Sequence, residues 1–102
     1  MVQTIEIKIA SGSLILYDAI LIPEKNICYL NSKKYEIEET IPKRILKLLS
    51  YWKKEYGTAS GIDLQEFTIT VTTPTEETKF HGKGIYPSNY QQLLDILGEI
   101  DD

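Results

Sequence analysis

Apolar and polar residues alternate along the first part of the chain, in short runs separated by turn-forming residues. Ile5, Ile7 and Ile9 alternate with Glu6 and Lys8, which is typical of a strand with one buried face. Further apolar runs are bounded by clusters of Gly, Pro, Asn and Ser, and they cover residues 14–22, 27–30 and 35–37. This pattern predicts four strands joined by short turns in an antiparallel meander.

The spacing of the apolar positions becomes helical after Thr40. Six large apolar residues follow at intervals that place them on one helix face, namely Ile41, Ile45, Leu48, Leu49, Trp52 and Tyr56. They predict an amphipathic helix over residues 41–56. Thr40 is expected to be its N-cap, and Gly57 is expected to end it as the left-handed residue after the C-terminus.

Two strands and a helix are expected in the rest of the chain. Alternation of Phe, Ile and Val with Thr predicts a strand over residues 67–72, and residues 77–82 return as its partner. Ser88 and Gln91 have the spacing of a capping box, so the last helix is expected to begin near Ser88. The chain therefore predicts an α+β fold in one domain, residues 1–102, with an antiparallel sheet of about six strands and both helices on one face.

The charge is unevenly distributed along a chain of 102 residues with a formal net charge of −4. Residues 43–54 contain five basic residues and no acidic residue, whereas the remainder is strongly acidic. An acidic body argues against general nucleic-acid binding but permits a local contact with an anionic group. The predicted helix presents the candidate binding residues, which are Lys43, Arg44, Lys47, Tyr51 and Lys54. A merely solvated helix surface is the alternative.

Residues 79–94 gather the only histidine, two glycines, a proline and two tyrosines between a strand and a helix. Gly82 and Gly84 permit a sharp bend, and Pro87 stiffens the approach to the helix, so the segment is interpreted as a strand-to-helix joint. An anion site using Lys83 and the helix N-terminus is the alternative. Pro87 removes a backbone donor from that site, and the spacing does not match a phosphate-binding loop.

The same segment resembles a C-terminal motif of small uncharacterised bacterial proteins, Tyr/Phe-x-Gly-x-x-x-Tyr-Pro-x-Asn-Tyr/Phe-x-x-Leu. The matching residues are Phe80, Gly82, Tyr86, Pro87, Asn89, Tyr90 and Leu93. The resemblance implies a shared fold element and no activity.

Few residues offer catalytic or metal-binding chemistry. Cys28 is the single cysteine and lies in an apolar run, so it is expected in the core, and no internal disulfide or cysteine-based zinc site is possible. His81 is expected to be solvated, and pairing of His81 with Cys28 is only a formal alternative. His81 and Lys83 form a second candidate binding patch. We expect no metal site, no cofactor and no catalytic residue.

The chain is therefore expected to be a non-enzymatic protein–protein interaction or regulatory module of unknown partner, with self-association through the open sheet face or an edge strand as one form. The alternative is binding of nucleic acid or another polyanion through helix 41–56. The longest apolar run, residues 14–22, is interrupted by Asp18 and too short to span a membrane. Without a recognisable targeting segment, a cytoplasmic location away from membranes is expected.

Overall fold

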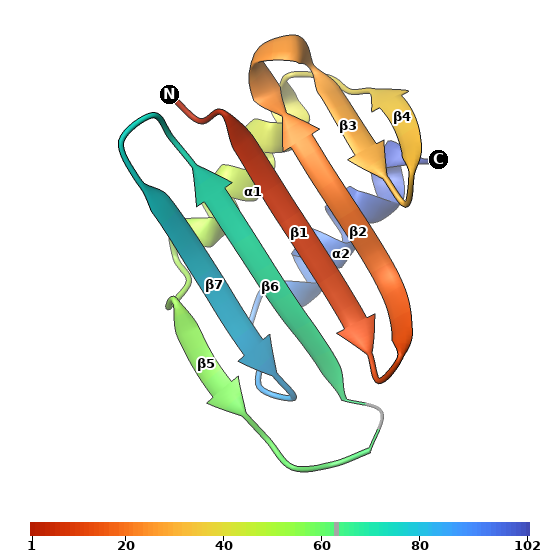
Figure 1. The fold of residues 1–102 in the computed structure, drawn as a ribbon, viewed down its shortest axis with the longest axis vertical. Helices are drawn as coiled ribbons and strands as arrows, with labels where there is room; N and C mark the ends of the chain where they lie inside the picture. Colours follow the sequence, from red (N-terminus) through yellow and green to blue (C-terminus); the bar gives the residue numbers. More distant parts are fainter. Residues whose placement is uncertain (63) are drawn as a thin grey trace.

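The computed structural model describes residues 1–62 and 64–102. Within these residues the chain forms a seven-stranded sheet and two α-helices (Figure 1). The strands are β1 (Thr4–Ser11), β2 (Leu14–Ile22), β3 (Ile27–Leu30), β4 (Lys33–Glu36), β5 (Glu55–Thr58), β6 (Gln65–Thr72) and β7 (Glu77–Lys83). The helices are α1 (Thr40–Leu49) and α2 (Tyr90–Ile100), and a short 3₁₀ helix covers Pro23–Lys25.

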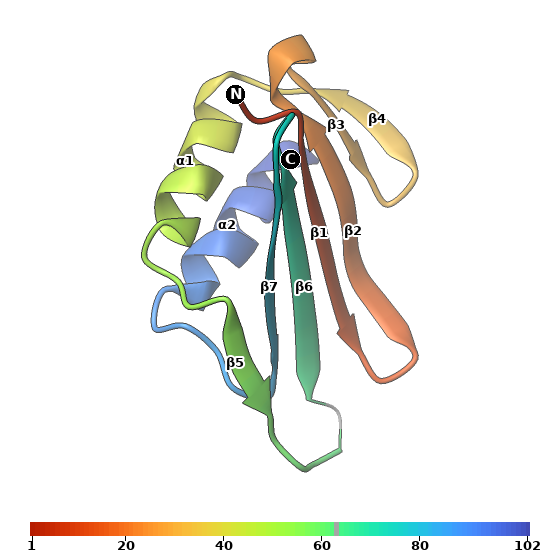
Figure 2. The ribbon, with the colours of Figure 1, turned by 60° about the vertical axis from the view of Figure 1, so that its left-hand side comes forward.

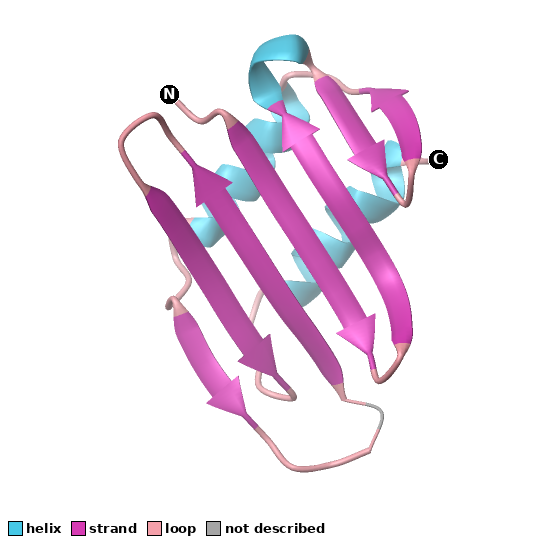
Figure 3. Ribbon diagram, viewed as in Figure 1, coloured by secondary structure: helices cyan, strands magenta, loops and turns pink. Residues whose placement is uncertain are grey.

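The strand order across the sheet is β4-β3-β2-β1-β6-β7-β5 (Figure 3). Neighbouring strands are antiparallel except β5, which runs parallel to β7. Both helices lie against the same face of the sheet (Figure 2). The α+β class, the strands at 14–22 and 27–30 and the placement of the helices on one face are confirmed.

The core lies between the sheet and the helices. In β1, Ile5, Ile7 and Ile9 are buried while Glu6 and Lys8 are exposed, as the period of two along a strand requires. Strand β6 contributes buried residues in register with β1, and both helices turn a buried stripe toward them; the contributing residues include Phe67, Ile69, Ile45, Leu93 and Leu97.

The prediction of an antiparallel sheet of about six strands is wrong, because β5 adds a parallel edge strand. The chain leaves the helix at Leu49, where the amide of Tyr51 donates to the carbonyl of Leu48, a tightened last turn. Trp52 and Tyr56 still contact the core, but Trp52 lies in the turn after the helix, where its amide donates to the carbonyl of Leu49, and Tyr56 lies in β5. Gly57 has a φ of +85° inside β5 and does not cap the helix. The apolar side chains at helical spacing therefore reach the core as expected, although the backbone of residues 50–58 does not form a helix.

The expected capping residues are also displaced. Thr40 is the first residue of α1 and Glu39 occupies the N-cap position. Helix α2 begins at Tyr90, and from the residues that the structure describes no side-chain hydrogen bond caps its first turn. The N-cap residue of α2, Asn89, instead accepts a hydrogen bond from Nε1 of Trp52 at 2.6 Å. Asn89 is thus used to hold the segment after α1 against the start of α2.

One face of the sheet is free of helices (Figure 2). It carries charged and threonine side chains, with Ile20 and Tyr29 partly exposed among them. The edge strand β4 has four residues and begins with two lysines, features that discourage strand-to-strand association. Among the described residues, no helix is long and apolar enough to cross a membrane.

Candidate functional site

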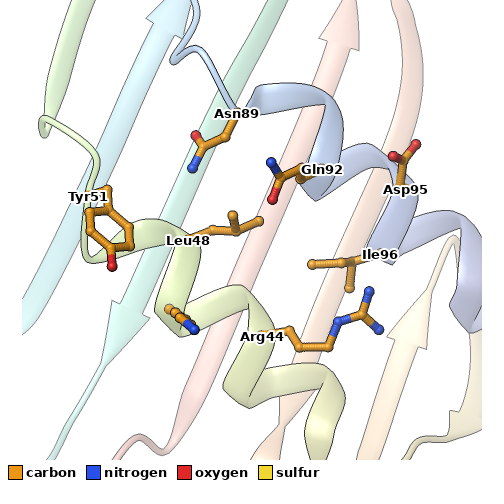
Figure 4. Close-up of a pocket in the computed structure, with 8 residues that line it drawn as sticks. Arg44, Leu48, Tyr51, Asn89, Gln92, Asp95 and Ile96 are labelled. Carbon is orange, nitrogen blue, oxygen red and sulfur yellow. The ribbon is translucent and has the colours of Figure 1, made fainter.

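A groove of about 380 Å³ runs between α1 and α2 on the outer side of the helix layer (Figure 4). Leu48 from α1 and Ile96 from α2 point toward each other across its floor. The remaining lining residues are Arg44, Lys47 and Tyr51 from the α1 side and Asn89, Gln92 and Asp95 from the α2 side. The two walls come from separate elements that pack side by side only in the folded chain.

An ion pair closes one end of the groove. The guanidinium of Arg44 donates to both carboxylate oxygens of Glu99, at 2.9 and 2.7 Å. This two-point contact raises the pKa of Arg44 and lowers the pKa of Glu99. The helices run antiparallel, because Arg44 of α1 contacts Glu99 near the end of α2, whereas Trp52, after the end of α1, contacts Asn89 at the start of α2.

The Trp52–Asn89 hydrogen bond lies near the other end of the groove. Between the two ends, Lys47 lies on the α1 side and Asp95 on the α2 side. Asp95 accepts a hydrogen bond from Gln91 at 3.0 Å. The ring of Tyr51 is 75% exposed at the rim. The site therefore combines a small apolar floor, an exposed aromatic ring, a basic wall and an acidic wall.

The structure brings three of the five candidate residues from the predicted basic helix together: Arg44, Lys47 and Tyr51. Lys43 instead lies on the exposed side of α1, 4.0 Å from Glu39. Lys54 is beyond the end of α1, where its carbonyl accepts the amide of His81 at 2.8 Å. The prediction of one helix over residues 41–56 is therefore wrong in its length, because α1 ends at Leu49 and Lys54 does not lie on it.

His81 lies on the helix-free face between two carboxylates. Its Nδ1 is 2.8 Å from Glu55 of β5, and its Nε2 is 2.7 Å from Glu66 of β6. The imidazole side chain is 29% exposed, so His81 is partly solvated, but it also pairs with two carboxylates that the sequence pattern did not predict. Hydrogen bonds to Glu66 and then Glu55 raise the pKa of His81, and the bond to His81 lowers the pKa of Glu55.

These partners were missed because they are distant in sequence, 26 residues away for Glu55 and 15 for Glu66. Only the strand order, with β7 between β5 and β6, brings them to His81. Lys83 follows on the same strand, opposite Glu66 and Thr58. The second candidate patch is therefore a mixed-charge cluster that includes carboxylates not anticipated from the sequence.

The cluster is not arranged as a metal site. A metal requires ligand atoms that converge on one point, whereas the two ring nitrogens of His81 contact two different carboxylates. Among the described residues, no group of three His, Cys, Asp or Glu side chains is placed to hold a metal ion.

Cys28 and His81 cannot work as a pair. Cys28 is buried in the core on β3, while His81 lies on the opposite face of β7. Strands β2, β1 and β6 lie between β3 and β7, a separation of about 19 Å at the usual strand spacing. Burial also raises the pKa of the Cys28 thiol to about 11, which disfavours the reactive thiolate.

The strand-to-helix joint of residues 79–94 is built as expected. Phe80 and Tyr90 are buried, and Tyr86 stacks on Tyr90 with 4.7 Å between ring centroids. The Tyr86 hydroxyl accepts the amide of Gln65 and donates to its carbonyl, both at 3.0 Å. These contacts fix the start of α2, and hence one wall of the groove, against the first residue of β6.

Comparisons with known proteins identify no relative from which a function can be transferred. No family model matches the chain, and neither a curated protein nor a solved structure matches it. The geometry of the groove is consequently the main guide to function.

Proposed function

We propose that this protein is a non-enzymatic interaction module whose α1–α2 groove binds a segment of a protein partner. The observation that carries the proposal is the composition of the groove. An apolar floor of Leu48 and Ile96 lies between walls of opposite charge, with Tyr51 exposed at the rim. Grooves between helices bind protein segments by taking apolar side chains on the floor while polar groups at the rim set orientation.

Tyr51 is the expected anchor of this site. Tyrosine is enriched among the residues that contribute most to protein–protein binding, because it offers a large contact area at low entropic cost. Tyr51 is 75% exposed although the adjacent Trp52 is buried. A partner that covers Tyr51 would bury an apolar surface that the fold leaves in water.

The state of the reactive side chains supports a non-enzymatic role. Both ring nitrogens of His81 are occupied by carboxylates, so the imidazole is not free to exchange protons with a substrate. The thiol of Cys28 is buried with a raised pKa. Both groups are better explained as parts of the fold than as catalytic residues.

Binding of nucleic acid or another polyanion through α1 is the alternative. Lys43 and Lys47 are exposed on this helix, which favours it. Arg44 is neutralised by Glu99, however, and Asp95 lies on the facing wall. Replacing Lys43 and Lys47 by Glu should abolish salt-dependent retention on immobilised nucleic acid if this alternative is correct. Absence of retention by the unmodified protein at low salt would exclude it.

The groove proposal can be tested with peptides selected from a random display library on the immobilised protein. We expect selected peptides to shift the amide resonances of Leu48 and Ile96. We also expect them to lose affinity for Tyr51→Ala by about tenfold or more, as for a binding hot spot. Lys79→Glu on the helix-free sheet face is the matched control and should bind normally. Peptides that bind the Tyr51 variant unchanged, or shift only sheet residues, would contradict the proposal.

A further inference from the structure

We infer that the partner in this groove is a second copy of the chain, and that two helix layers pack face to face about a two-fold axis lying along the groove. This inference rests on the proposed function, because it names the occupant of the same groove. It is carried by the charge of the two walls, which are opposite in sign at equal positions along the groove.

Three contacts define positions along the groove. The Arg44–Glu99 ion pair marks one end, and the Trp52–Asn89 hydrogen bond marks the other. Leu48 and Ile96 point toward each other in between (Figure 4). Counted from the Arg44–Glu99 pair, Lys47 lies three residues along α1 and Asp95 lies four residues back along the antiparallel α2. At a rise of about 1.5 Å per residue, the basic and the acidic side chain therefore lie at nearly the same height on opposite walls.

A two-fold axis along the groove leaves the height of every residue unchanged and exchanges the two walls. It therefore places α1 of one copy over α2 of the other. Lys47 then faces Asp95 of the second copy, and the symmetry makes this contact twice, as in any isologous interface. Within the described residues, Lys47 has no carboxylate within ion-pair distance in its own chain.

The exposed Tyr51 of each copy also fits this arrangement. Tyr51 and Gln92 line the same end of the groove from opposite sides, so exchange of the walls places the ring of Tyr51 over Gln92 of the second copy. The apolar floors of the two grooves then face each other at the centre, between the charged contacts of the walls. This is the usual anatomy of a protein interface.

The helix layer suits self-association better than the sheet does. The edge strands β4 and β5 have four residues each, and β4 begins with two lysines, which discourages edge pairing. The helix-free face has Glu6, Lys8 and Asp18 near its middle, and burying these charges would cost solvation. The self-association expected through the sheet is therefore reassigned to the helices.

The area of the helix layer sets the expected affinity of the dimer. Helices of 10 and 11 residues are about 15 Å long. Two helices side by side offer less contact area than the roughly 800 Å² per partner of a standard stable interface. We therefore expect a weak dimer in equilibrium with monomer, with a dissociation constant of about 10 µM or higher.

Sedimentation velocity across the range from about 10 µM to about 1 mM protein tests this dimer. We expect Lys47→Glu alone and Asp95→Lys alone to weaken association by about tenfold or more, because each places two like-charge pairs in the interface. An equimolar mixture of the two variants should associate again, since every facing pair in the mixed dimer has opposite charges. The double variant Lys47→Glu with Asp95→Lys should recover for the same reason.

Lys79→Glu on the helix-free face is the control and should associate like the unmodified protein, and circular dichroism should show that every variant is folded. An unmodified protein that stays monomeric at the highest concentration would overturn the inference, as would a mixture that associates no better than either variant alone. If the protein is monomeric but selected peptides bind its groove, the proposed function stands and only the second copy is rejected as the partner.

Discussion

At the scale of single residues, Gly82 shows how tightly the joint between β7 and α2 is packed. A Cβ atom at this position would lie 2.6 Å from the carbonyl oxygen of Ile85 and 2.7 Å from Cε1 of Phe67. Both neighbours are constrained, because one is backbone and the other is a fully buried ring. Gly98 on α2 is the opposite case, since an added Cβ would meet no described atom within 4 Å.

We expect Gly82→Ala to destabilise the fold by about 2 kcal/mol or more, as overpacking of a rigid site does. Gly98→Ala is the matched control and should stabilise by about 0.5–1 kcal/mol, because alanine favours a helix interior. Urea unfolding at low protein concentration measures both. Equal effects of the two substitutions would contradict the packing argument.

Cys28 gives a second prediction at this scale. Its thiol is buried and has a pKa raised to about 11, so the thiolate is rare at neutral pH. We expect the folded protein to resist a thiol reagent at pH 8 and to react fully after denaturation in urea. Rapid reaction of the folded protein would show that β3 opens readily.

At the scale of elements, β5 depends most on distant contacts. Its backbone pairing with β7 is flanked by two hydrogen bonds, from the amide of His81 to the carbonyl of Lys54 and from the amide of Ala59 to the carbonyl of Lys83. The side chain of Glu55 adds the contact with His81. Because β5 is a short edge strand, this contact between side chains is expected to influence how often the strand opens.

The pH dependence of this contact follows from its two pKa shifts. Because the pKa of His81 is raised in the folded protein, the contribution of His81 to stability is complete below the ordinary pKa of 6.5. It is lost as pH rises through the folded pKa. A lowered Glu55 pKa means that its contribution is present above the ordinary value of 4.5 and is lost as pH falls through the folded value. The contact therefore stabilises the fold most between these ordinary values. Glu66, Lys79 and Lys83 share this face of the sheet.

We expect the melting temperature of the unmodified protein to exceed that of His81→Gln most clearly at about pH 5–6, and the difference to shrink by about pH 9. Thermal scans of both proteins across this range measure the effect. The same comparison in a Glu55→Gln background is the control, and the difference in melting temperature should depend less on pH there. A difference that does not change with pH would show that protonation of His81 is unimportant for stability.

At the scale of the whole molecule, an aromatic cluster joins the sheet to the helices. Trp52 lies 5.5 Å from Phe67 of β6 and 6.3 Å from Tyr90 of α2, measured between ring centroids. Trp52 also donates to Asn89. A single buried cluster includes residues from both ends of the sheet and from both helices. Loss of one layer would thus expose the apolar face of the other.

We therefore expect the chain to unfold as one cooperative unit, as predicted for one domain. The fluorescence of Trp52 and the far-ultraviolet circular dichroism should give coincident urea transitions. The first signal reports the junction between sheet and helices, and the second reports the whole backbone. Separate midpoints for the two signals would contradict a single domain.

The alternation and spacing of apolar residues determined which side chains are buried, and this was predictable because burial of one face is a local property of a strand or helix. Ile5, Ile7 and Ile9 are buried as expected, as are Trp52 and Phe80. The same pattern placed Arg44, Lys47 and Tyr51 on one surface, and the structure brings them to one groove.

Only the tertiary structure decided the path of residues 50–58 and the partners of the polar side chains. Trp52 can reach the core from a helix or from the turn that follows it, so its burial did not distinguish the two backbone paths. Strand β5 forms because the edge of β7 offers it hydrogen-bonding partners. The pairs Arg44–Glu99 and His81–Glu55 join residues 55 and 26 positions apart. A local pattern carries no information about such distant contacts, because the order and packing of whole elements create them.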